Sequence, residues 1–540
     1  MQGPLLSPTT GKTKCVGSPV STMALHRPLF PEGKAGYDLA ESAPCAKGVR
    51  PYLLAATILA SAMAVIDGTI VTIALPAIQR DLQTSFATLQ WVVNAYSLTL
   101  GGLLVAGGSA GDRYGRRRVF LAGTVLFTFA SISCALAPST IILIIARLIQ
   151  GGGAALMIPQ SLAIIAASFP RDIRGVAIGH WASASAITTA LGPALGGLII
   201  DHLGWRAAFW INVPFAAATI ILTLRYVPES KDASAVGSLD WKGGLLAVLG
   251  FGCLASGLTS ASESARSASS WPILTVAGLV SLGLLVSLER KAPNPLLPLS
   301  LFRRRAFVGV NLITLLLYGS FYAVLFLLPF DLIEERGYSA SQVGFALLPA
   351  GVVIAVFANF GARWGDASGP RWPLISGSVL VTFAALGLAS HRSGLVLGIL
   401  LPLLSMAAGM AIAVAPLTTA ALNSAPDSQS GTASGVNNAA SRLAGLFSVA
   451  IIGSVVSIAF FSYLKANGMD VSGKMPIRFG ELPKLPSPLR SLIEHAFVHA
   501  YAAGMVAAAT FGALAAIIAL YTIKPKPISS NRKARPLSEN

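Results

Sequence analysis

The sequence contains few charged residues. Only 11% of its 540 residues are Asp, Glu, Lys or Arg, whereas a typical soluble domain has about 25%. Hydrophobic residues account for 54%, and the mean hydropathy is +0.69. Because so little polar surface cannot cover an apolar core of this size, the composition excludes a water-soluble globular protein and indicates a chain embedded in lipid.

Cysteine and acidic residues are scarce as well. The four cysteines, Cys15, Cys45, Cys134 and Cys253, show no metal-ligand spacing, and we interpret them as unpaired. The chain has 39 basic and 22 acidic residues, so its net charge is +17. Such an excess is typical of some nucleic-acid-binding proteins, but here Lys and Arg lie in short clusters between apolar runs, as in membrane proteins. We therefore expect no nucleic-acid partner.

A cleavable signal peptide is not evident. Residues 1–50 mix Pro, Gly, Ser and charged residues and contain no apolar segment of the right length. We predict a disordered cytoplasmic tail over this region, with Met23 as an alternative start because every recognisable feature follows it.

Long apolar runs dominate the rest of the chain. A membrane-spanning helix needs about 20 predominantly apolar residues. We predict an all-α polytopic membrane protein with fourteen spans, at 52–78, 88–110, 118–137, 139–168, 174–200, 206–226, 241–260, 271–288, 307–331, 341–361, 372–390, 394–417, 431–461 and 497–523. An even number of spans places both termini on one side of the membrane.

The distribution of basic residues predicts which side that is. Loops on the side of the termini carry clusters such as 116–118 and 303–305. The first six loops on the other side contain only Arg80, Arg206, Arg266, Arg336 and Arg392. Because Lys and Arg favour the cytoplasmic side, we predict a multi-pass protein of the inner or plasma membrane with both termini cytoplasmic.

One short motif occurs twice. "GDRYGRR" at 111–117 follows the second span, and "GDASGPR" at 365–371 follows the tenth. Related segments at 170–179 and 426–435 lead into spans 5 and 13. Spans 1–6 and 9–14 therefore look like two copies in the same orientation, with spans 7 and 8 between them. Secondary transporters with such repeats bind substrate between the halves, near the middle of the membrane.

These motifs and several others resemble the major facilitator superfamily, most closely its 14-span drug:proton antiporter branch. The matching segments are "VIDGTIVTIALPAI" in span 1, "GGSAGDRYGRRR" after span 2, "ARLIQGGGAALMIPQS" in span 4, "ALGPALGGLI" in span 5, and "WRAAFWINVP", "LDWKGG" and "GYSASQVGFALLP" further on. The resemblance covers nearly the whole membrane region. It implies the major-facilitator fold, made of two six-helix bundles plus two extra central helices, and transport powered by the proton gradient without a cofactor.

The predicted domain organisation follows from the spans and the repeat. It comprises a disordered cytoplasmic tail (1–50), an N-terminal six-helix bundle (51–230), a two-helix insert with linkers (231–305), a C-terminal six-helix bundle with a long external loop (306–525, loop 462–496) and a cytoplasmic tail (526–540).

Asp67 is the one acidic residue that we place deep in a span. A carboxylate at the bilayer centre costs about 3 kcal/mol, so it indicates a function. At the helical rise, Asp67 lies about 16 Å and Arg147 about 12 Å from the outer ends of their spans. A carboxyl group takes up a proton more readily as it loses water and releases it as a cation approaches. We predict Asp67 as the proton carrier and Arg147 as the cation that tunes it; a purely structural pair between spans 1 and 4 is the alternative.

The resemblance also implies residues that govern conformational change: Gly108, Asp112, Arg113, Gly115, Arg116 and Arg117 in the loop after span 2, and Gly192, Pro193, Gly196 and Gly197 in span 5. From the residues alone, the basic loop anchors the cytoplasmic face. The Gly-Pro pair removes a helical hydrogen bond, so that span 5 can bend and pack closely. The resemblance, and not the residues alone, implies that Asp112 faces a helix N-terminus in one state and leaves it in the other.

Other polar residues within the spans are Asn94, Tyr96, Gln160, His180, Asn437, Asn438 and Arg442. We expect some to line a cavity and most to form interhelical hydrogen bonds, each contributing about 0.6 kcal/mol. His495 and His499 have a spacing that suits a metal, but no third ligand is evident, so we interpret them as the polar entry to span 14. We predict no metal, no cofactor and no catalytic residues.

The predicted function is proton-coupled export of small lipophilic or drug-like compounds by alternating access. A proton-linked symporter for a small metabolite on the same fold is the first alternative, and a polytopic membrane enzyme the second. With Asp67 as the single deep acid and with Arg147 and Arg442 nearby, we expect a preference for neutral or singly positive molecules over dications, with weak acids left open. The expected partners are a small-molecule substrate, protons and the lipid bilayer; a periplasmic adaptor is left open.

Overall fold

The structure is a computed structural model that describes residues 48–232, 240–263, 270–292, 299–390, 394–426, 429–469 and 487–525. The predicted tail at 1–50, apart from its last three residues, and the tail at 526–540 lie outside the described residues. Most of the predicted external loop lies outside them too.

Within the described residues, all regular structure is helical. The N-terminal half contains α1 (Arg50–Leu82), α2 (Phe86–Tyr114), α3 (Arg116–Ala135), α4 (Thr140–Ser168), α5 (Arg171–Leu203), α6 (Ala207–Trp210) and α7 (Asn212–Tyr226). The insert contains α8 (Trp241–Glu263) and α9 (Trp271–Lys291). The C-terminal half contains η1 (Leu301–Arg303), α10 (Arg305–Phe330), η2 (Asp331–Glu335), α11 (Ala340–Ser368), α12 (Arg371–Ala389), η3 (Val396–Leu400), α13 (Leu401–Asn423), α14 (Ser430–Ala466) and α15 (Ser487–Thr522). Fourteen segments in the described part of the chain are long and apolar enough to cross a membrane, which confirms the predicted number.

Some helices differ in detail from the prediction. The sixth span is broken between α6 and α7, because Pro214 has no N–H to continue the helical bonding there. Helices α14 and α15 extend into the predicted external loop 462–496, so that residues 467–486 separate them. An ion pair between Arg490 and Glu494, at 2.7 Å and one helical turn apart, supports the early start of α15.

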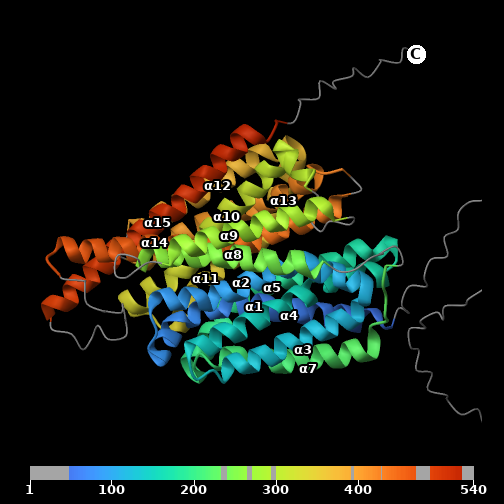
Figure 1. Cartoon of the computed structure of the whole chain (residues 1–540), viewed down its shortest axis with the longest axis horizontal. Helices are drawn as coiled ribbons and strands as arrows, with labels where there is room; N and C mark the ends of the chain where they lie inside the picture. Colours follow the sequence, from blue (N-terminus) through green and yellow to red (C-terminus); the bar gives the residue numbers. More distant parts are fainter. Residues whose placement is uncertain are drawn as a thin grey trace, which may run out of the picture.

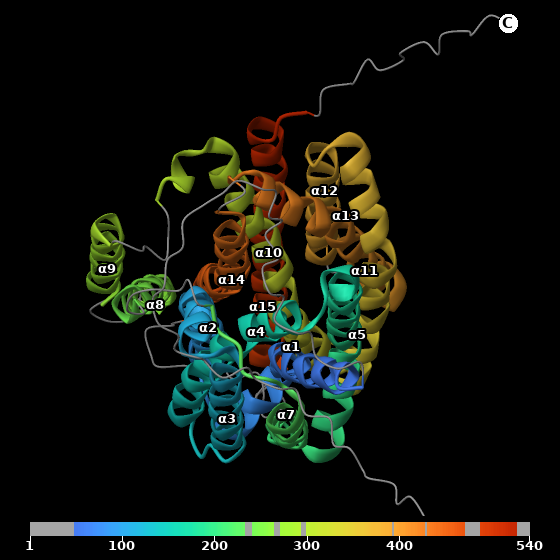
Figure 2. The same ribbon diagram turned by 90° about the vertical axis from the view of Figure 1, so that its right-hand side faces the viewer.

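The two halves lie side by side with all long helices running roughly in one direction or its reverse (Figure 1). We call the end at which α1 begins and α15 ends the terminal face, and the other end the opposite face. The insert helices lie on one side of the molecule, where α8 packs against α2 and α14 and α9 packs on α8, whereas α5 and α11 lie together on the other side (Figure 2). The insert therefore covers one of the two seams between the halves.

The internal repeat is visible in the packing. A Cβ atom added to Gly107 on α2 would lie 2.0 Å from the carbonyl oxygen of Ala155 on α4. The equivalent Cβ on Gly361 of α11 would lie 2.5 Å from the carbonyl oxygen of Ala411 on α13. Both helix pairs approach so closely that only glycine fits, which is how small residues hold helices together in lipid.

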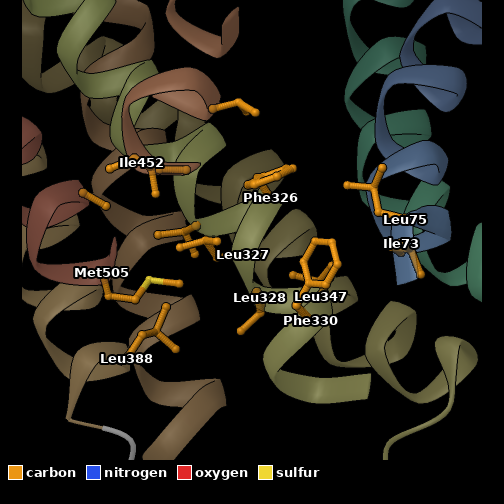
Figure 3. Packing of buried hydrophobic residues seen from close by; sticks show 14 of the residues in the cluster. Ile73, Leu75, Phe326, Leu327, Leu328, Phe330, Leu347, Leu388, Ile452 and Met505 are labelled. Carbon is orange, nitrogen blue, oxygen red and sulfur yellow. The ribbon is translucent and has the colours of Figure 1, made fainter. Parts of the chain in front are cut away.

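The largest apolar cluster joins the two halves toward the opposite face. Figure 3 shows Ile73 of α1 across from Phe326 and Phe330 of α10, all of them buried. The ring of Phe86, at the start of α2, lies 5.6 Å and 5.3 Å from those of Phe326 and Phe330. This packing closes the opposite face between α1, α2 and α10.

Candidate functional site: a buried ion pair beside a central cavity

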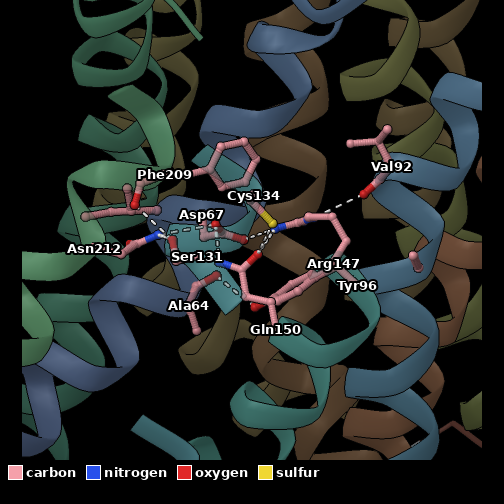
Figure 4. Close-up of polar contacts among 12 residues, drawn as sticks. Ala64, Asp67, Val92, Tyr96, Ser131, Cys134, Arg147, Gln150, Phe209 and Asn212 are labelled. Carbon is pink, nitrogen blue, oxygen red and sulfur yellow. Dashed lines mark hydrogen bonds and ion pairs between the residues drawn. The ribbon is translucent and has the colours of Figure 1, made fainter. Parts of the chain in front are cut away.

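Asp67 of α1 and Arg147 of α4 form an ion pair inside the N-terminal half (Figure 4). Their exposed fractions are 0% and 1%. The structure thus brings together the two residues for which the sequence predicted similar depth. Because a buried charge without a partner is strongly unfavourable, each of these residues stabilises the other.

Further polar groups hold both members of the pair. Gln150 Nε2 donates a 2.8 Å hydrogen bond to Asp67 Oδ1, and Arg147 donates one of 2.8 Å to Gln150 Oε1. Asn212 Nδ2 of α7 lies 3.4 Å from Asp67 Oδ1 and 2.9 Å from Ser131 Oγ of α3. The cluster therefore connects α1, α3, α4 and α7.

Gln150, Asn212 and Ser131 are functional candidates that the sequence reasoning missed. Gln150 and Asn212 occur inside motifs quoted for the resemblance, and Gln150 is one of the matching residues of the span 4 motif, but neither was assigned a role. A helical spacing of three residues from Arg147 was an available signal for Gln150. Ser131 gave no such signal, because a serine in an apolar span is common.

Tyr96 of α2 packs on the ion pair at the space between the halves. The guanidinium carbon of Arg147 lies 4.3 Å from the centre of the Tyr96 ring, a cation–π contact. The Tyr96 hydroxyl donates a 3.2 Å hydrogen bond to the carbonyl of Ala64. Arg147 also donates from Nε to the carbonyl of Val92, at 3.1 Å. Arg147 is thereby fixed against two helices, α1 and α2, as well as its own.

A cavity of about 420 Å³ lies between the halves. Its walls come from α1, α2, α4 and α5 of one half and from α10, α11, α13 and α14 of the other. Tyr96, Arg147 and Arg442 line it, whereas Asp67 does not. The volume is within the range of sites that hold drug-sized molecules, and the walls are mainly apolar.

The span 5 motif packs against both α1 and α11. Cβ atoms added to Gly192 and Gly196 would lie 2.6 Å from side-chain atoms of Thr69 and Ile70 on α1. A Cβ on Gly197 would lie 2.2 Å from the carbonyl oxygen of Ala340 on α11. A Cβ atom added to Gly344 of α11 would likewise lie 2.2 Å from the carbonyl oxygen of Pro193. The motif thus joins the halves along the part of α5 nearest the opposite face.

Two polar contacts reinforce this closure. The carboxylate of Asp201, at the end of α5, accepts hydrogen bonds from the backbone N–H groups of Ala340 (3.1 Å) and Ser341 (2.8 Å), at the N-terminus of α11. A carboxylate is stabilised there by the helix dipole. Arg80 of α1 and Glu334 of η2 form a second contact between the halves, at 3.6 Å.

At the terminal face, the same pair of helices is open. Gly175 and Gly179 of α5 have no neighbour within 4 Å of an added Cβ. The cavity is therefore closed toward the opposite face and accessible from the terminal face.

The loop motif after span 2 forms a local network at the terminal face. Asp112 accepts hydrogen bonds from Nε (3.1 Å) and Nη2 (2.8 Å) of Arg116. Arg117 donates from its backbone to Glu229 and from its side chain to the carbonyl of Leu224.

Gly115, at the centre of the motif, has a φ of 106°, a conformation that favours glycine. In the described residues, Arg113 Nε and Nη1 have no hydrogen-bond partner, and a Cβ atom added to Gly108 would meet only Pro159, at 3.6 Å. The switch predicted for Asp112 remains a prediction.

The other polar residues follow the expectation only in part, because in the described structure neither polar atom of the Asn94 side chain has a hydrogen-bond partner. Tyr96 and Arg442 line the cavity, whereas Gln160 donates to the carbonyl of Gly107 and Asn437 to the hydroxyl of Thr314, both between helices. A buried acid that the sequence reasoning placed just outside span 8 is Glu289, whose exposed fraction is 3%. No group of three metal-ligating side chains occurs in the described part of the chain.

Comparisons with known proteins agree with this architecture. The family model described as "Major Facilitator Superfamily" matches residues 57–449. The chain is 34% identical over 407 residues to the multidrug resistance protein Stp of Mycobacterium tuberculosis, with 75% of each chain covered. It is 30% identical over 502 residues to the tetracenomycin C resistance and export protein of Streptomyces glaucescens, covering 88% of this chain and 92% of that protein.

A similar solved structure is that of a bacterial homologue of the human lysosomal transporter Spinster, in an inward-facing and occupied conformation. The TM-score is 0.67, the identity 17%, and the coverage 88% of this chain and 97% of the other. At this identity the similarity shows the fold alone.

Proposed function

The chain belongs to the major facilitator superfamily, and we propose that it is a proton-coupled exporter of small lipophilic compounds that works by alternating access. The names of its relatives, a multidrug resistance protein and an antibiotic resistance and export protein, support export. The observation that carries the proposal is the buried Asp67–Arg147 pair, whose arginine lines an apolar cavity that opens at one face only.

The terminal face is cytoplasmic in this proposal, because the clusters of Lys and Arg lie on that side. The conformation is then open to the cytoplasm, where an exporter loads its substrate. Release requires the reverse arrangement, in which α5 and α11 separate at the opposite face and close at the terminal face.

Proton binding at Asp67 supplies the coupling. A protonated carboxyl no longer forms an ion pair, so Arg147 loses its counter-charge and the contacts around it rearrange. Arg147 lines the cavity, so this rearrangement changes the surface that the substrate meets.

A direct path leads from Asp67 to the closed face. Thr69 and Ile70 follow Asp67 on α1 and pack against Gly192 and Gly196 of α5. The adjacent Gly197 packs against α11. A small movement of α1 near Asp67 would be transmitted to the contact that closes the opposite face, because helices packed this closely cannot move independently of one another.

A transport assay tests the proposal. The purified full-length protein is reconstituted into liposomes, a lipophilic fluorescent compound is added, and a pH gradient is imposed in either direction. We expect the compound to move in the direction opposite to the flow of protons, and a protonophore to abolish this movement. Accumulation of substrate in the same direction as protons would support the symporter instead, and the absence of gradient-dependent movement would refute secondary transport.

A further inference from the structure

The central cavity carries positive charge. Of the described residues that line it, the charged ones are Arg147 and Arg442. The charge of Arg147 is balanced by Asp67, which is wholly buried behind the cavity wall. Arg442, on α14, therefore sets the net charge of the cavity.

Arg442 lies where α14 crosses α2 between the halves. A Cβ atom on Gly101 of α2 would lie 3.3 Å from the Cβ of Arg442. Arg442 shares the cavity wall with Tyr96, Tyr318 and Tyr322. In the described residues it forms no ion pair with Asp or Glu.

These groups offer more hydrogen-bond donors than acceptors. A guanidinium has five N–H donors and no acceptor, and a neutral tyrosine hydroxyl can donate one hydrogen bond besides accepting one. A cation in a mainly apolar wall gains most from a ligand that brings an acceptor, and most of all a negatively charged one. A second cation brought into the same space would be repelled and would lose its hydration without replacement.

The remaining walls favour flat apolar rings. Tyr318, Phe321 and Tyr322 form an aromatic patch on α10, with ring centres about 6 Å apart. Met406 and Met410 of α13 also line the cavity, and methionine side chains adapt to ligands of different shape.

We propose that the cavity selects lipophilic aromatic compounds that present an oxygen acceptor to Arg442, with carboxylates and phenolates bound most tightly, neutral carbonyl compounds less tightly and lipophilic cations least. The inference rests on the proposed export function and names its substrate class. It differs from the expectation drawn from the sequence, which allowed singly positive substrates, because Asp67 does not reach the cavity in this conformation.

Three compounds with one ring system test the charge preference. Anthracene-9-carboxylate, its methyl ester and 9-(aminomethyl)anthracene differ in charge at a single position, and their fluorescence reports binding to purified full-length protein in detergent. We expect the acid to bind at least about tenfold more tightly than the amine, as charge-assisted hydrogen bonds typically provide, with the ester between them.

Substitutions at Arg442 assign the preference to this residue. Arg442→Met should weaken binding of the acid by about tenfold or more, affect the ester less and leave the amine unchanged or tighter. Arg442→Lys should retain part of the preference for the acid. Met410→Leu changes the same wall at nearly constant volume and charge and is the matched control, for which we expect the order of the three compounds to persist.

Equal affinity of the parent protein for acid and amine, absence of acid binding, or an equal loss of all three compounds in Arg442→Met would overturn the inference. Because these are binding measurements, they are independent of the transport assay. A parent protein that exports amines under a pH gradient but binds acids poorly would retain the exporter function and lose the proposed substrate class.

Discussion

The guanidinium of Arg147 lies between the carboxylate of Asp67 and the ring of Tyr96, which itself lines the central cavity. One cation thus contacts both the proton-binding candidate and the wall of the substrate space. Substrate cannot touch Asp67 in this conformation, because the carboxylate is wholly buried. Coupling between proton and substrate would therefore pass through Arg147 and Tyr96, not through competition for one carboxylate.

The first prediction concerns the stability of this pair. Arg147→Leu leaves the carboxylate of Asp67 buried without a counter-charge and should destabilise the protein by about 3–5 kcal/mol. The double variant Asp67→Asn with Arg147→Leu removes both charges and should recover most of that loss. Thermal unfolding of purified protein in detergent measures both. Strictly additive losses would mean that the two residues do not stabilise each other.

The second prediction concerns the closure at the opposite face. Asp201→Asn removes the charge that caps the N-terminus of α11 and should loosen this face, with a free-energy change of about 0.5–2 kcal/mol. Spin labels near the C-terminal end of α5 and the N-terminal end of α11 should report a larger population of molecules in which these two helices are separated. Asp81→Asn is the matched control, because Asp81 lies at the same face but pairs with Arg206 in its own half. A shift of equal size in the control would indicate a general effect of surface charge.

The third prediction concerns a substitution that should stabilise the closed opposite face. Gln90 of α2 is wholly buried, and in the described structure neither polar atom of its side chain has a hydrogen-bond partner. It packs against Gly453 of α14, so this contact forms when the opposite face is closed. Gln90→Met keeps the length of the side chain and removes the unpaired amide, and it should favour the closed state by about 1–3 kcal/mol.

The same pair of spin labels measures the effect of Gln90→Met. We expect the population with separated helices to fall, whereas an increase would show that the amide finds better partners in the closed state than in the open one.

The sequence predicted the main architecture because the relevant physics is local. The hydrophobicity and length of each apolar run predict a span without knowledge of its neighbours. The similar depth of Asp67 and Arg147 followed from the helical rise, and the structure pairs them. The repeat of "GDRYGRR" predicted two similar halves, and the matching contacts of Gly107 and Gly361 agree with this.

Other features depend on how helices are rotated about their axes, which hydropathy does not specify. Asn212 faces Asp67 only because α7 packs on α1 with one particular side, and Asp201 reaches α11 only in one arrangement of the halves. The position of Asp67 behind the cavity wall also depends on the rotation of its helix. For this reason the substrate charge expected from the sequence differs from the one that the structure favours. Glu289 was placed outside its span because charged residues 289–291 obscured the end of the apolar run.

The fourth prediction concerns orientation. In a background without native cysteines, Arg116→Cys at the terminal face should be protected from a membrane-impermeant thiol reagent added to intact cells. Asn467→Cys, at the end of α14 on the opposite face, should react, because the positive-inside rule places that face outside. The reverse labelling pattern would invert the orientation and with it the direction of the proposed transport.

The fifth prediction addresses the central claim that Asp67 carries the proton. Asp67→Asn preserves the size and polarity of the side chain but cannot exchange a proton. Two assays in liposomes separate coupling from substrate handling: efflux driven by a pH gradient, and exchange of labelled for unlabelled substrate without a gradient. Asp67→Glu, which keeps the titratable group, serves as the control for disturbed packing.

Gradient-driven transport by Asp67→Asn, measured at equal amounts of folded protein, is the most direct measurement. The account predicts that this variant loses gradient-driven export while it still exchanges substrate, and that Asp67→Glu retains some coupling. Export by Asp67→Asn at the parental rate, with the same dependence on the pH gradient, would contradict the account.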